Sequence, residues 1–176
     1  MKQAFNLKKM VLTALFTALV CVSTLLIQIQ MPATQGYVNI GDCFVLLSAW
    51  VLGPAFGAFA GGVGSALADL IGGYPHYIAG TLVIKALMCV IAALVYRALG
   101  KKHGYLGRIA GGALAELWMV LGYFLYAWMI LGKGLAAATS IPGNLLQGAI
   151  GLVAAVALIA ALRESKTLDR VEARSH

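Results

Sequence analysis

The residues best able to do chemistry in this chain are ionisable and amide side chains placed inside, or at the mouth of, long apolar stretches. They are Asp42, Asp69, Lys85 and Glu116, followed by the pair Asn144 and Gln147. Such groups are costly in hydrocarbon, so each one requires a partner, a water-filled cavity or a bound polar molecule. The sequence therefore points to a polar binding site embedded in a membrane.

Helix geometry gives the depth of two of these groups. Lys85 should lie ~13 Å below the outer face of the membrane and Glu116 ~12 Å above the inner face, which places them within ~5 Å of each other in depth. Because either charge alone would be costly, we predict a buried ion pair between them. This pair would be either purely structural or in contact with a ligand.

A second set of polar side chains is expected in the outer half of the membrane. Tyr123 shares a helical face with Glu116. Asn144 and Gln147 fall in the first turns of the last apolar stretch, and Asp69 lies ~5 Å from the outer face. Amides, phenols and one or two charges together suit a small, polar, aromatic molecule.

Polar residues in two outer loops supply further candidates. They are Gln35, Tyr37 and Asn39 in one loop, and Tyr74, His76 and Tyr77 in the other. Aromatic residues in such loops serve either as anchors at the membrane surface or as stacking partners for a ligand. We expect His76 to be a solvated loop residue.

The composition places these residues in a membrane protein. The 176 residues are 61% hydrophobic and 11% charged, with a mean hydropathy of +0.90, whereas soluble domains are about 25% charged. Apolar runs of about 18 to 25 residues are continuous rather than alternating, so they predict spanning helices and not barrel strands. We predict an all-α bundle of six transmembrane helices in a single domain spanning residues 1–176. The helices cover residues 10–29, 42–52, 54–71, 77–99, 108–131 and 141–162, followed by a polar cytoplasmic tail, 163–176.

The net charge of +7 reflects topology. Basic residues gather near both termini and between the fourth and fifth predicted helices, whereas the loops at residues 30–41, 72–76 and 132–142 are almost free of them. With six spans the basic clusters lie on one side, and the excess of Lys and Arg in cytoplasmic loops puts both termini in the cytoplasm. We expect these residues to meet the lipid bilayer surface, and a nucleic-acid partner is excluded.

Enzyme classes are poorly supported. Lys133 is followed by Gly134 rather than Ser or Thr, so there is no ATP-binding Walker A motif. No histidine lies within a predicted span to serve as a base, and the three cysteines show no metal-binding spacing, so we expect no catalytic residue, metal or cofactor. A channel or assembly protein would instead show rings of charge or an oligomerisation face without a convergent polar pocket.

Small residues indicate where helices approach closely. The third predicted helix carries Gly53, Gly57 and Gly61 at intervals of four, which predicts packing inside the bundle. Ala14 and Ala18 form a similar face on the first predicted helix. That face either packs within the bundle or docks another subunit.

Four segments in this order resemble the substrate-binding S components of bacterial energy-coupling factor (ECF) vitamin transporters. They are residues 39–42 (NIGD), the glycine-rich stretch from 53–58 (GPAFGA) through 68–73 (ADLIGG), residues 81–88 (TLVIKALM) and residues 142–148 (PGNLLQG). The similarity extends from Lys8 to Leu162. It is closest to the riboflavin-type group, which also includes members for pyridoxine-like compounds and pyrimidine precursors.

The resemblance implies a multi-pass protein of the bacterial cell membrane with a vitamin pocket near the outer face. The loop of residues 30–41 would close this pocket. Ala14 and Ala18 match a face through which such proteins dock to a membrane scaffold subunit driven by two ATPases. Delivery is then expected to involve toppling of the whole S component in the membrane, with no enzymatic activity in this chain.

We predict that substrate is bound by Asn39, Asp69, Lys85, Glu116, Tyr123, Asn144 and Gln147. This compact set favours a single substituted ring, either pyridoxine-like or a hydroxymethylpyrimidine. Riboflavin is the alternative, and its isoalloxazine would need a wide aromatic cleft.

Overall fold

The structure, a computed structural model, describes residues 7–164 except for the side chains of residues 100–103, 163 and 164. Its elements are α1 (Leu7–Leu26), β1 (Gln28–Met31), β2 (Gly36–Asn39), α2 (Asp42–Leu52), α3 (Pro54–Gly72), α4 (Ile78–Leu125), the π-helix η1 (Tyr126–Ile130), the 3-10 helix η2 (Gly134–Thr139) and α5 (Ser140–Glu164). The predicted all-α membrane bundle is confirmed, with one short hairpin added.

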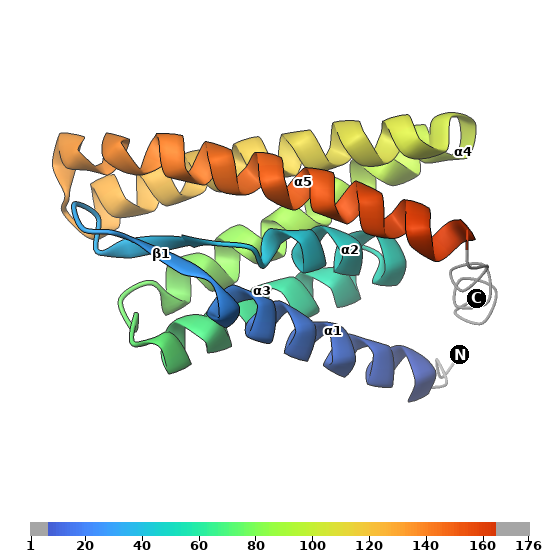
Figure 1. Cartoon of the computed structure of the whole chain (residues 1–176), viewed down its shortest axis with the longest axis horizontal. Helices are drawn as coiled ribbons and strands as arrows, with labels where there is room; N and C mark the ends of the chain where they lie inside the picture. The colour runs from blue at the N-terminus through green and yellow to red at the C-terminus, as the bar shows by residue number, and fades with distance from the viewer. Residues whose placement is uncertain (1–6, 165–176) are drawn as a thin grey trace, which may run out of the picture.

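The chain reverses direction within α4, so that this segment supplies two antiparallel helices (Figure 1). Trp118 Nε1 donates to the carbonyl of Ile84 at 3.1 Å, and these residues are 34 positions apart. A straight helix would separate them by ~51 Å. The two halves correspond to separate spans, Ile78–Leu99 and Gly104–Ile130.

Within residues 7–164, five helical segments are long and apolar enough to cross a membrane: α1, α3, the two halves of α4, and the segment Gly134–Leu162 that contains most of α5. The second predicted helix, residues 42–52, corresponds to α2, which has 11 residues. It is therefore ~16 Å long, about half of the hydrocarbon thickness. Nearly all of its side chains are buried, so α2 begins inside the bundle and not at its surface.

The end of the first helix differs from the prediction of residues 10–29. α1 ends at Leu26, and Gln28–Met31 pairs antiparallel with Gly36–Asn39. The sequence QIQM alternates polar and apolar residues, which is the period of a strand. The apolar residues Ile29 and Met31 concealed this alternation because they continue the hydrophobic run of α1.

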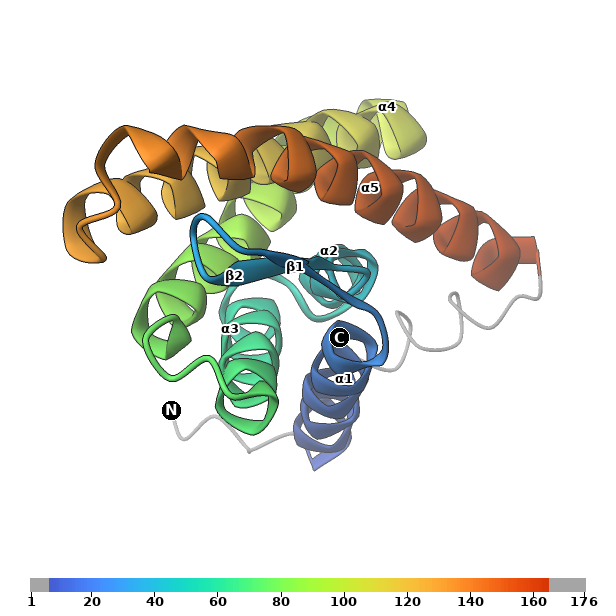
Figure 2. The same ribbon diagram turned by 60° about the vertical axis from the view of Figure 1, so that its left-hand side comes forward.

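α2 lies in the middle of the bundle, with α1 and α3 on one side and α4 and α5 on the other (Figures 1 and 2). The β1–β2 hairpin covers one end of the bundle. The first residue of α1 and the last residue of α5 both lie at the opposite end, where α4 also reverses.

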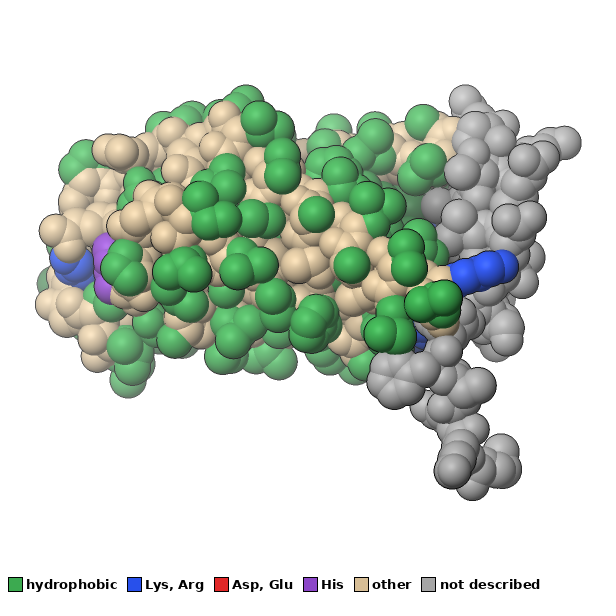
Figure 3. All heavy atoms as spheres, turned by 90° about the horizontal axis from the view of Figure 1, so that it is seen from below, with side chains coloured by type: hydrophobic (Ala, Val, Ile, Leu, Met, Phe, Trp, Pro, Cys, Tyr) green, Lys and Arg blue, Asp and Glu red, His purple; other side chains and the backbone are tan. Residues whose placement is uncertain are grey.

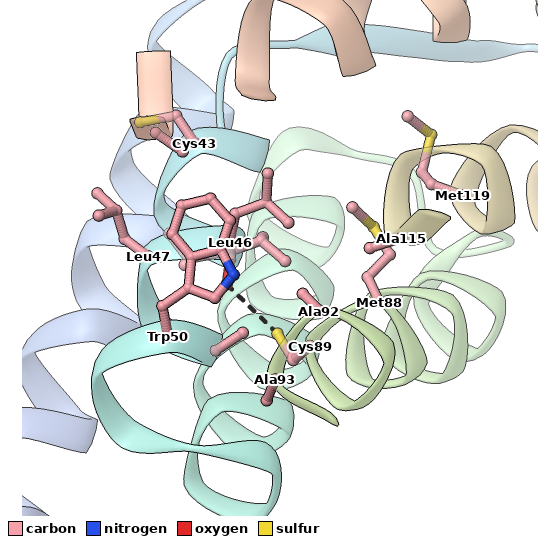
Figure 4. Packing of buried hydrophobic residues seen from close by; sticks show 14 of the residues in the cluster. Cys43, Leu46, Leu47, Trp50, Met88, Cys89, Ala92, Ala93, Ala115 and Met119 are labelled. Atoms are coloured by element: carbon pink, nitrogen blue, oxygen red, sulfur yellow. Dashed lines mark hydrogen bonds between the residues drawn. The ribbon is translucent and has the colours of Figure 1, made fainter. Parts of the chain in front are cut away.

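The apolar core forms around α2. Leu46 and Trp50 of α2 belong to one cluster with Met88 and Cys89 from the first half of α4 and with Met119 from the second half (Figure 4). These side chains are almost fully buried. The core thus ties the central short helix to both arms of α4.

Glycines on α3 allow the neighbouring helices to approach, as predicted. A Cβ atom at Gly57 would lie 2.8 Å from the Ala49 Cα of α2, and one at Gly61 would lie 2.5 Å from the Cys89 sulfur. Contacts this close require a glycine.

The same argument gives a stability prediction at Gly64. A Cβ atom there would lie 2.6 Å from the Thr17 carbonyl oxygen and 2.9 Å from Val20 Cβ, both on α1. We expect Gly64→Leu to lower the free energy of unfolding by about 1–3 kcal/mol through overpacking. Ala55→Leu, at an exposed position on the same helix, is the control, and thermal unfolding in detergent compares them. Equal stability of the two variants would contradict close α1–α3 packing.

The surface agrees with a membrane environment. Figure 3 shows hydrophobic side chains spread over the middle of one face, with Lys or Arg side chains at its two ends. Exposed apolar side chains such as Met129 and Val153 lie on the outside of the bundle, where lipid would cover them.

Candidate functional site

A cavity of about 460 Å³, counting its open mouth, lies beneath the β1–β2 hairpin. Its walls come from the hairpin, the end of α1, α3, both halves of α4 and the start of α5. Polar and aromatic side chains from separate helices converge on it, which is the usual character of a site for a small molecule.

Six of the seven predicted substrate residues line this cavity: Asn39, Asp69, Lys85, Tyr123, Asn144 and Gln147. Other lining residues were missed, including Ser65, Thr81 and Ser140. Ser65 precedes Asp69 by four positions, and Thr81 precedes Lys85 by four. Residues at this spacing share a helical face, so the sequence contained a signal for Ser65 and Thr81.

Glu116 does not line the cavity. Its carboxylate lies against α5, where a Cβ atom at Gly148 would be 3.0 Å from Oε2 and one at Gly151 would be 3.3 Å from Oε1. Neither oxygen has a hydrogen-bond partner within the described part of the chain. A Cβ atom at Gly151 would also lie 2.7 Å from Asp42 Cβ, so the glycine faces of α5 make room for both acidic residues behind the cavity wall.

The ion-pair partner of Lys85 is Asp42, and not Glu116 as the sequence suggested. Lys85 Nζ donates to Asp42 Oδ1, and both side chains are almost completely buried. Depth estimates assigned Lys85 and Glu116 to the same level but could not say which way either side chain points. Because α2 starts inside the bundle, its first residue, Asp42, reaches the ammonium group.

Asp42 also connects Lys85 to α5 and to the hairpin. Gln147 Nε2 donates to Asp42 Oδ2 at 2.7 Å, and the backbone N–H of Asn39 donates to Gln147 Oε1, also at 2.7 Å. With its oxygen and its nitrogen both engaged, the Gln147 amide has a defined orientation. Asn39 Oδ1 in turn accepts from the Gly41 N–H at 2.8 Å, which stabilises the turn into α2.

The opposite wall centres on Asp69. The Tyr37 hydroxyl donates to Asp69 Oδ1 at 2.6 Å. Burial, followed by the nearby charge of Asp69, raises the pKa of the Tyr37 phenol, so this phenol stays protonated and remains a donor. The Tyr123 hydroxyl donates to Thr81 Oγ1 at 3.1 Å, and its ring lies 5.5 Å from Lys85 Nζ, within range of a cation–π interaction.

The hairpin tip is attached to neighbouring loops at the same end of the bundle by three contacts. The Tyr77 hydroxyl donates to the Thr34 carbonyl at 2.9 Å, and Lys133 Nζ donates to Gln35 Oε1 at 2.7 Å. His76 Nε2 lies 3.2 Å from the Gln35 carbonyl oxygen. Gln35 itself has a φ of 55°, an uncommon conformation for a residue other than glycine. The hairpin therefore forms a roof over the cavity.

The aromatic residues of the two loops divide between two places. Tyr37 and Tyr77 line the cavity, whereas Tyr74 and His76 border a more open depression beside the hairpin. His76 is exposed, as predicted, although its ring contacts the hairpin. Thus Tyr37 and Tyr77 are positioned to contact a ligand in the cavity.

Ala14 and Ala18 are both exposed on the outer face of α1, whereas Thr13 and Val20 face the bundle. This arrangement does not fit the interpretation that the two alanines pack within the bundle. It leaves them accessible to another helix.

The chemistry of the cavity is that of a binding site. It presents an ammonium group, a carboxylate, three amides and several hydroxyls, which together can orient a small polar ring. Among residues 7–164, no three or more His, Cys, Asp or Glu side chains are arranged to hold a metal ion.

Known proteins are similar to this chain in sequence or in structure. An "Uncharacterized protein in gap 3'region" of Pyrococcus woesei is 42% identical over 142 residues, which cover 76% of this chain and 93% of the relative. The "Thiamine precursor transporter HmpT" of Lactococcus lactis subsp. cremoris is 29% identical over 154 residues, which cover 87% of this chain and 86% of the relative.

A solved structure described as the S component of a bacterial ECF transporter has the same fold. Its TM-score is 0.73 at 20% identity, covering 89% of this chain and 96% of that one. The profile of the family "ECF-type riboflavin transporter, S component" matches residues 4–164. The family and the named relatives are transporter components rather than enzymes. The chain therefore belongs to the ECF-type riboflavin transporter S component family, as a multi-pass membrane subunit that binds a vitamin for transport.

Proposed function

We propose that this protein captures a small, water-soluble vitamin or vitamin precursor with a single heteroaromatic ring, in the cavity beneath the hairpin. The supporting observation is the convergence of six predicted polar residues on one cavity at the end of the bundle. A pyridoxine-like compound or a hydroxymethylpyrimidine fits this description. The name of the HmpT relative, a thiamine precursor transporter, favours the pyrimidine.

The aromatic side chains of the cavity also favour a ligand with a single ring over the three-ring isoalloxazine of riboflavin. The rings of Tyr77 and Tyr123 lie 6.2 Å apart between centroids and are tilted by 58°. They do not form a flat slot, which an isoalloxazine would require. Riboflavin remains the second candidate because the family description names it.

Each predicted substrate residue has a proposed role. Lys85, Tyr123, Asn144 and Gln147 contact the ring directly, and Asp69 faces them from α3. Asn39 contributes mainly by holding the hairpin against Gln147. Glu116 acts from behind the wall, through its closeness to Asp42.

The cavity opens to the outside in this proposal. Lys8, Lys9 and Arg97 lie near the end of the bundle where α1 begins and α4 reverses, and Lys and Arg are enriched on the cytoplasmic side. Both termini are then cytoplasmic, and the hairpin end is external. Substrate enters beneath the hairpin from outside the cell.

Transport requires partners that supply energy. We propose that the exposed Ala14–Ala18 face docks to a membrane scaffold subunit driven by two ATPases, and that toppling of the docked protein delivers the substrate. This is the arrangement expected for ECF S components, and the exposure of both alanines supports it.

Binding by the purified protein tests the proposed substrate class. The detergent-purified chain would be extracted to identify any co-purified small molecule, and then titrated with a hydroxymethylpyrimidine, pyridoxine and riboflavin in a calorimeter. We expect a single-ring compound to bind at least about tenfold more tightly than riboflavin, which is ~1.4 kcal/mol. Co-purification of riboflavin would favour the alternative, and ion conductance by the protein in liposomes would favour a channel.

A matched pair of variants tests the position of the site. Asn144 lines the cavity, whereas Leu145, the next residue of α5, is exposed. We expect Asn144→Ala to weaken binding about tenfold, because truncation removes a buried amide from the ligand. Leu145→Ala should leave binding unchanged. Similar effects of the two variants would show that the cavity is not the site.

A further inference from the structure

α3 presents two unpartnered polar atoms to the cavity. Asp69 is 2% exposed and Ser65 is 1% exposed, and both line the cavity. Asp69 Oδ2 and Ser65 Oγ have no hydrogen-bond partner in the described chain. The two residues are four positions apart, so their side chains lie one above the other on the same helical face.

The residues that the structure describes around Asp69 do not satisfy its Oδ2 atom. The Tyr37 hydroxyl is directed to Oδ1. The Thr81 hydroxyl, which accepts from Tyr123, lies near enough to interact with Asp69 but completes no hydrogen bond to Oδ2. A buried carboxylate oxygen without a donor is costly. A ligand that donates hydrogen bonds at this position would remove that cost.

Charges around the cavity also restrict the ligand. Three acidic residues, Asp42, Asp69 and Glu116, are buried in or behind its walls, against the single ammonium group of Lys85, which already pairs with Asp42. The other basic groups nearby, Lys133 and His76, lie at the rim on Gln35. A phosphate ester carries about −1.5 to −2 charge at pH 7, so this excess of acidic groups would disfavour it.

From these observations we propose that Asp69 and Ser65 form the acceptor end of the site and select an unphosphorylated ring with an exocyclic amino group. This inference rests on the proposed vitamin-binding function and deepens it. An amino group offers two N–H donors, which match two neighbouring acceptors, whereas a hydroxyl offers only one. A ring carbonyl at the same position would place its oxygen, a hydrogen-bond acceptor, against the carboxylate, which is also an acceptor. The site therefore discriminates aminopyrimidines from pyrimidinones.

Competing ligands of nearly equal shape test this proposal. The full-length protein in detergent would be titrated with 4-amino-5-hydroxymethyl-2-methylpyrimidine, with its 4-oxo counterpart and with the phosphate ester of the amino compound. We expect the amino compound to bind at least about tenfold more tightly than either of the others. Equal binding of the amino and oxo compounds, or tighter binding of the ester, would overturn the proposal.

Variants then assign the selectivity to α3. Asp69→Asn keeps an oxygen to accept from Tyr37 but can turn an NH2 group toward the ligand, so we expect the preference for amino over oxo to disappear or reverse. Ser65→Ala is a smaller change, which guards against misfolding of the first variant, and it should reduce the preference severalfold. Ser48→Ala is the control, because its buried hydroxyl bonds to the Val45 carbonyl away from the cavity. An unchanged amino-to-oxo ratio in both Asp69→Asn and Ser65→Ala would overturn the assignment.

Failure of this inference can be distinguished from failure of the proposed function. Tight binding of single-ring compounds without discrimination at the amino group would reject the role of Asp69 and Ser65 and retain the single-ring site. Binding of riboflavin with no binding of either pyrimidine would reject both the inference and the proposed ring class.

Discussion

Replacement of Lys85 by methionine will lower the free energy of unfolding by about 3–5 kcal/mol, the usual cost of breaking a buried ion pair from one side. Lys85 and Asp42 are 2% and 0% exposed, so Asp42 would remain buried without its cation. The hydrogen bond from Gln147 would be its main remaining contact. Unfolding of the detergent-solubilised protein by heat or by SDS measures the loss.

The double variant Lys85→Met/Asp42→Asn separates stability from binding. Removing both charges should recover most of the lost stability, because neutral groups carry no uncompensated charge and the amide oxygen introduced by Asp42→Asn can still accept from Gln147. Binding should remain weak if the ammonium group contacts substrate. Lys133→Met is the control: its hydrogen bond to Gln35 is exposed, so a change below about 1 kcal/mol is expected. Wild-type stability in Lys85→Met would refute the Asp42–Lys85 pair.

Bulky residues at the alanine face of α1 should block uptake without affecting binding. In the double variant Ala14→Phe/Ala18→Phe, two aromatic rings would hold the helices of a scaffold subunit away from α1, which requires small residues for close approach. Thr24, the α1 residue that lines the cavity, is ten positions from Ala14 and so ~15 Å away along the helix. We expect uptake to fall to background and ligand affinity to stay unchanged.

Uptake would be measured with radiolabelled ligand in proteoliposomes that contain the scaffold and both ATPases, alongside calorimetry on the isolated chain. Val153→Phe is the control, because Val153 is 70% exposed on α5 rather than on α1. Normal uptake by the Ala14→Phe/Ala18→Phe variant would show that this face of α1 is not the docking face. Loss of binding in the isolated chain would instead mean that the substitutions disturb the bundle.

Much of this protein follows directly from its sequence. Continuous apolar runs determined the membrane class and the number of helices, because a span of hydrocarbon requires a helix of matching length. Helix depth and periodicity also predicted six residues that line the cavity. Asp69, Lys85 and Gln147 are polar groups at inward positions of apolar helices. Because a polar side chain within a membrane is energetically costly, such residues indicate a functional site. Glycines at intervals of four correctly marked α3 as a closely packed helix.

Other features were decided by the tertiary structure alone. Rise per residue gives depth along a helix, but the partner of a side chain depends on how each helix is rotated and on where its neighbours begin. Lys85 therefore pairs with Asp42 rather than Glu116, because α2 is too short to span and packing places its first residue inside the bundle. The hairpin likewise forms because β1 pairs with β2 in an antiparallel arrangement. Sequence periodicity is a local property, whereas pairing across the bundle is decided by the packing of all its helices together.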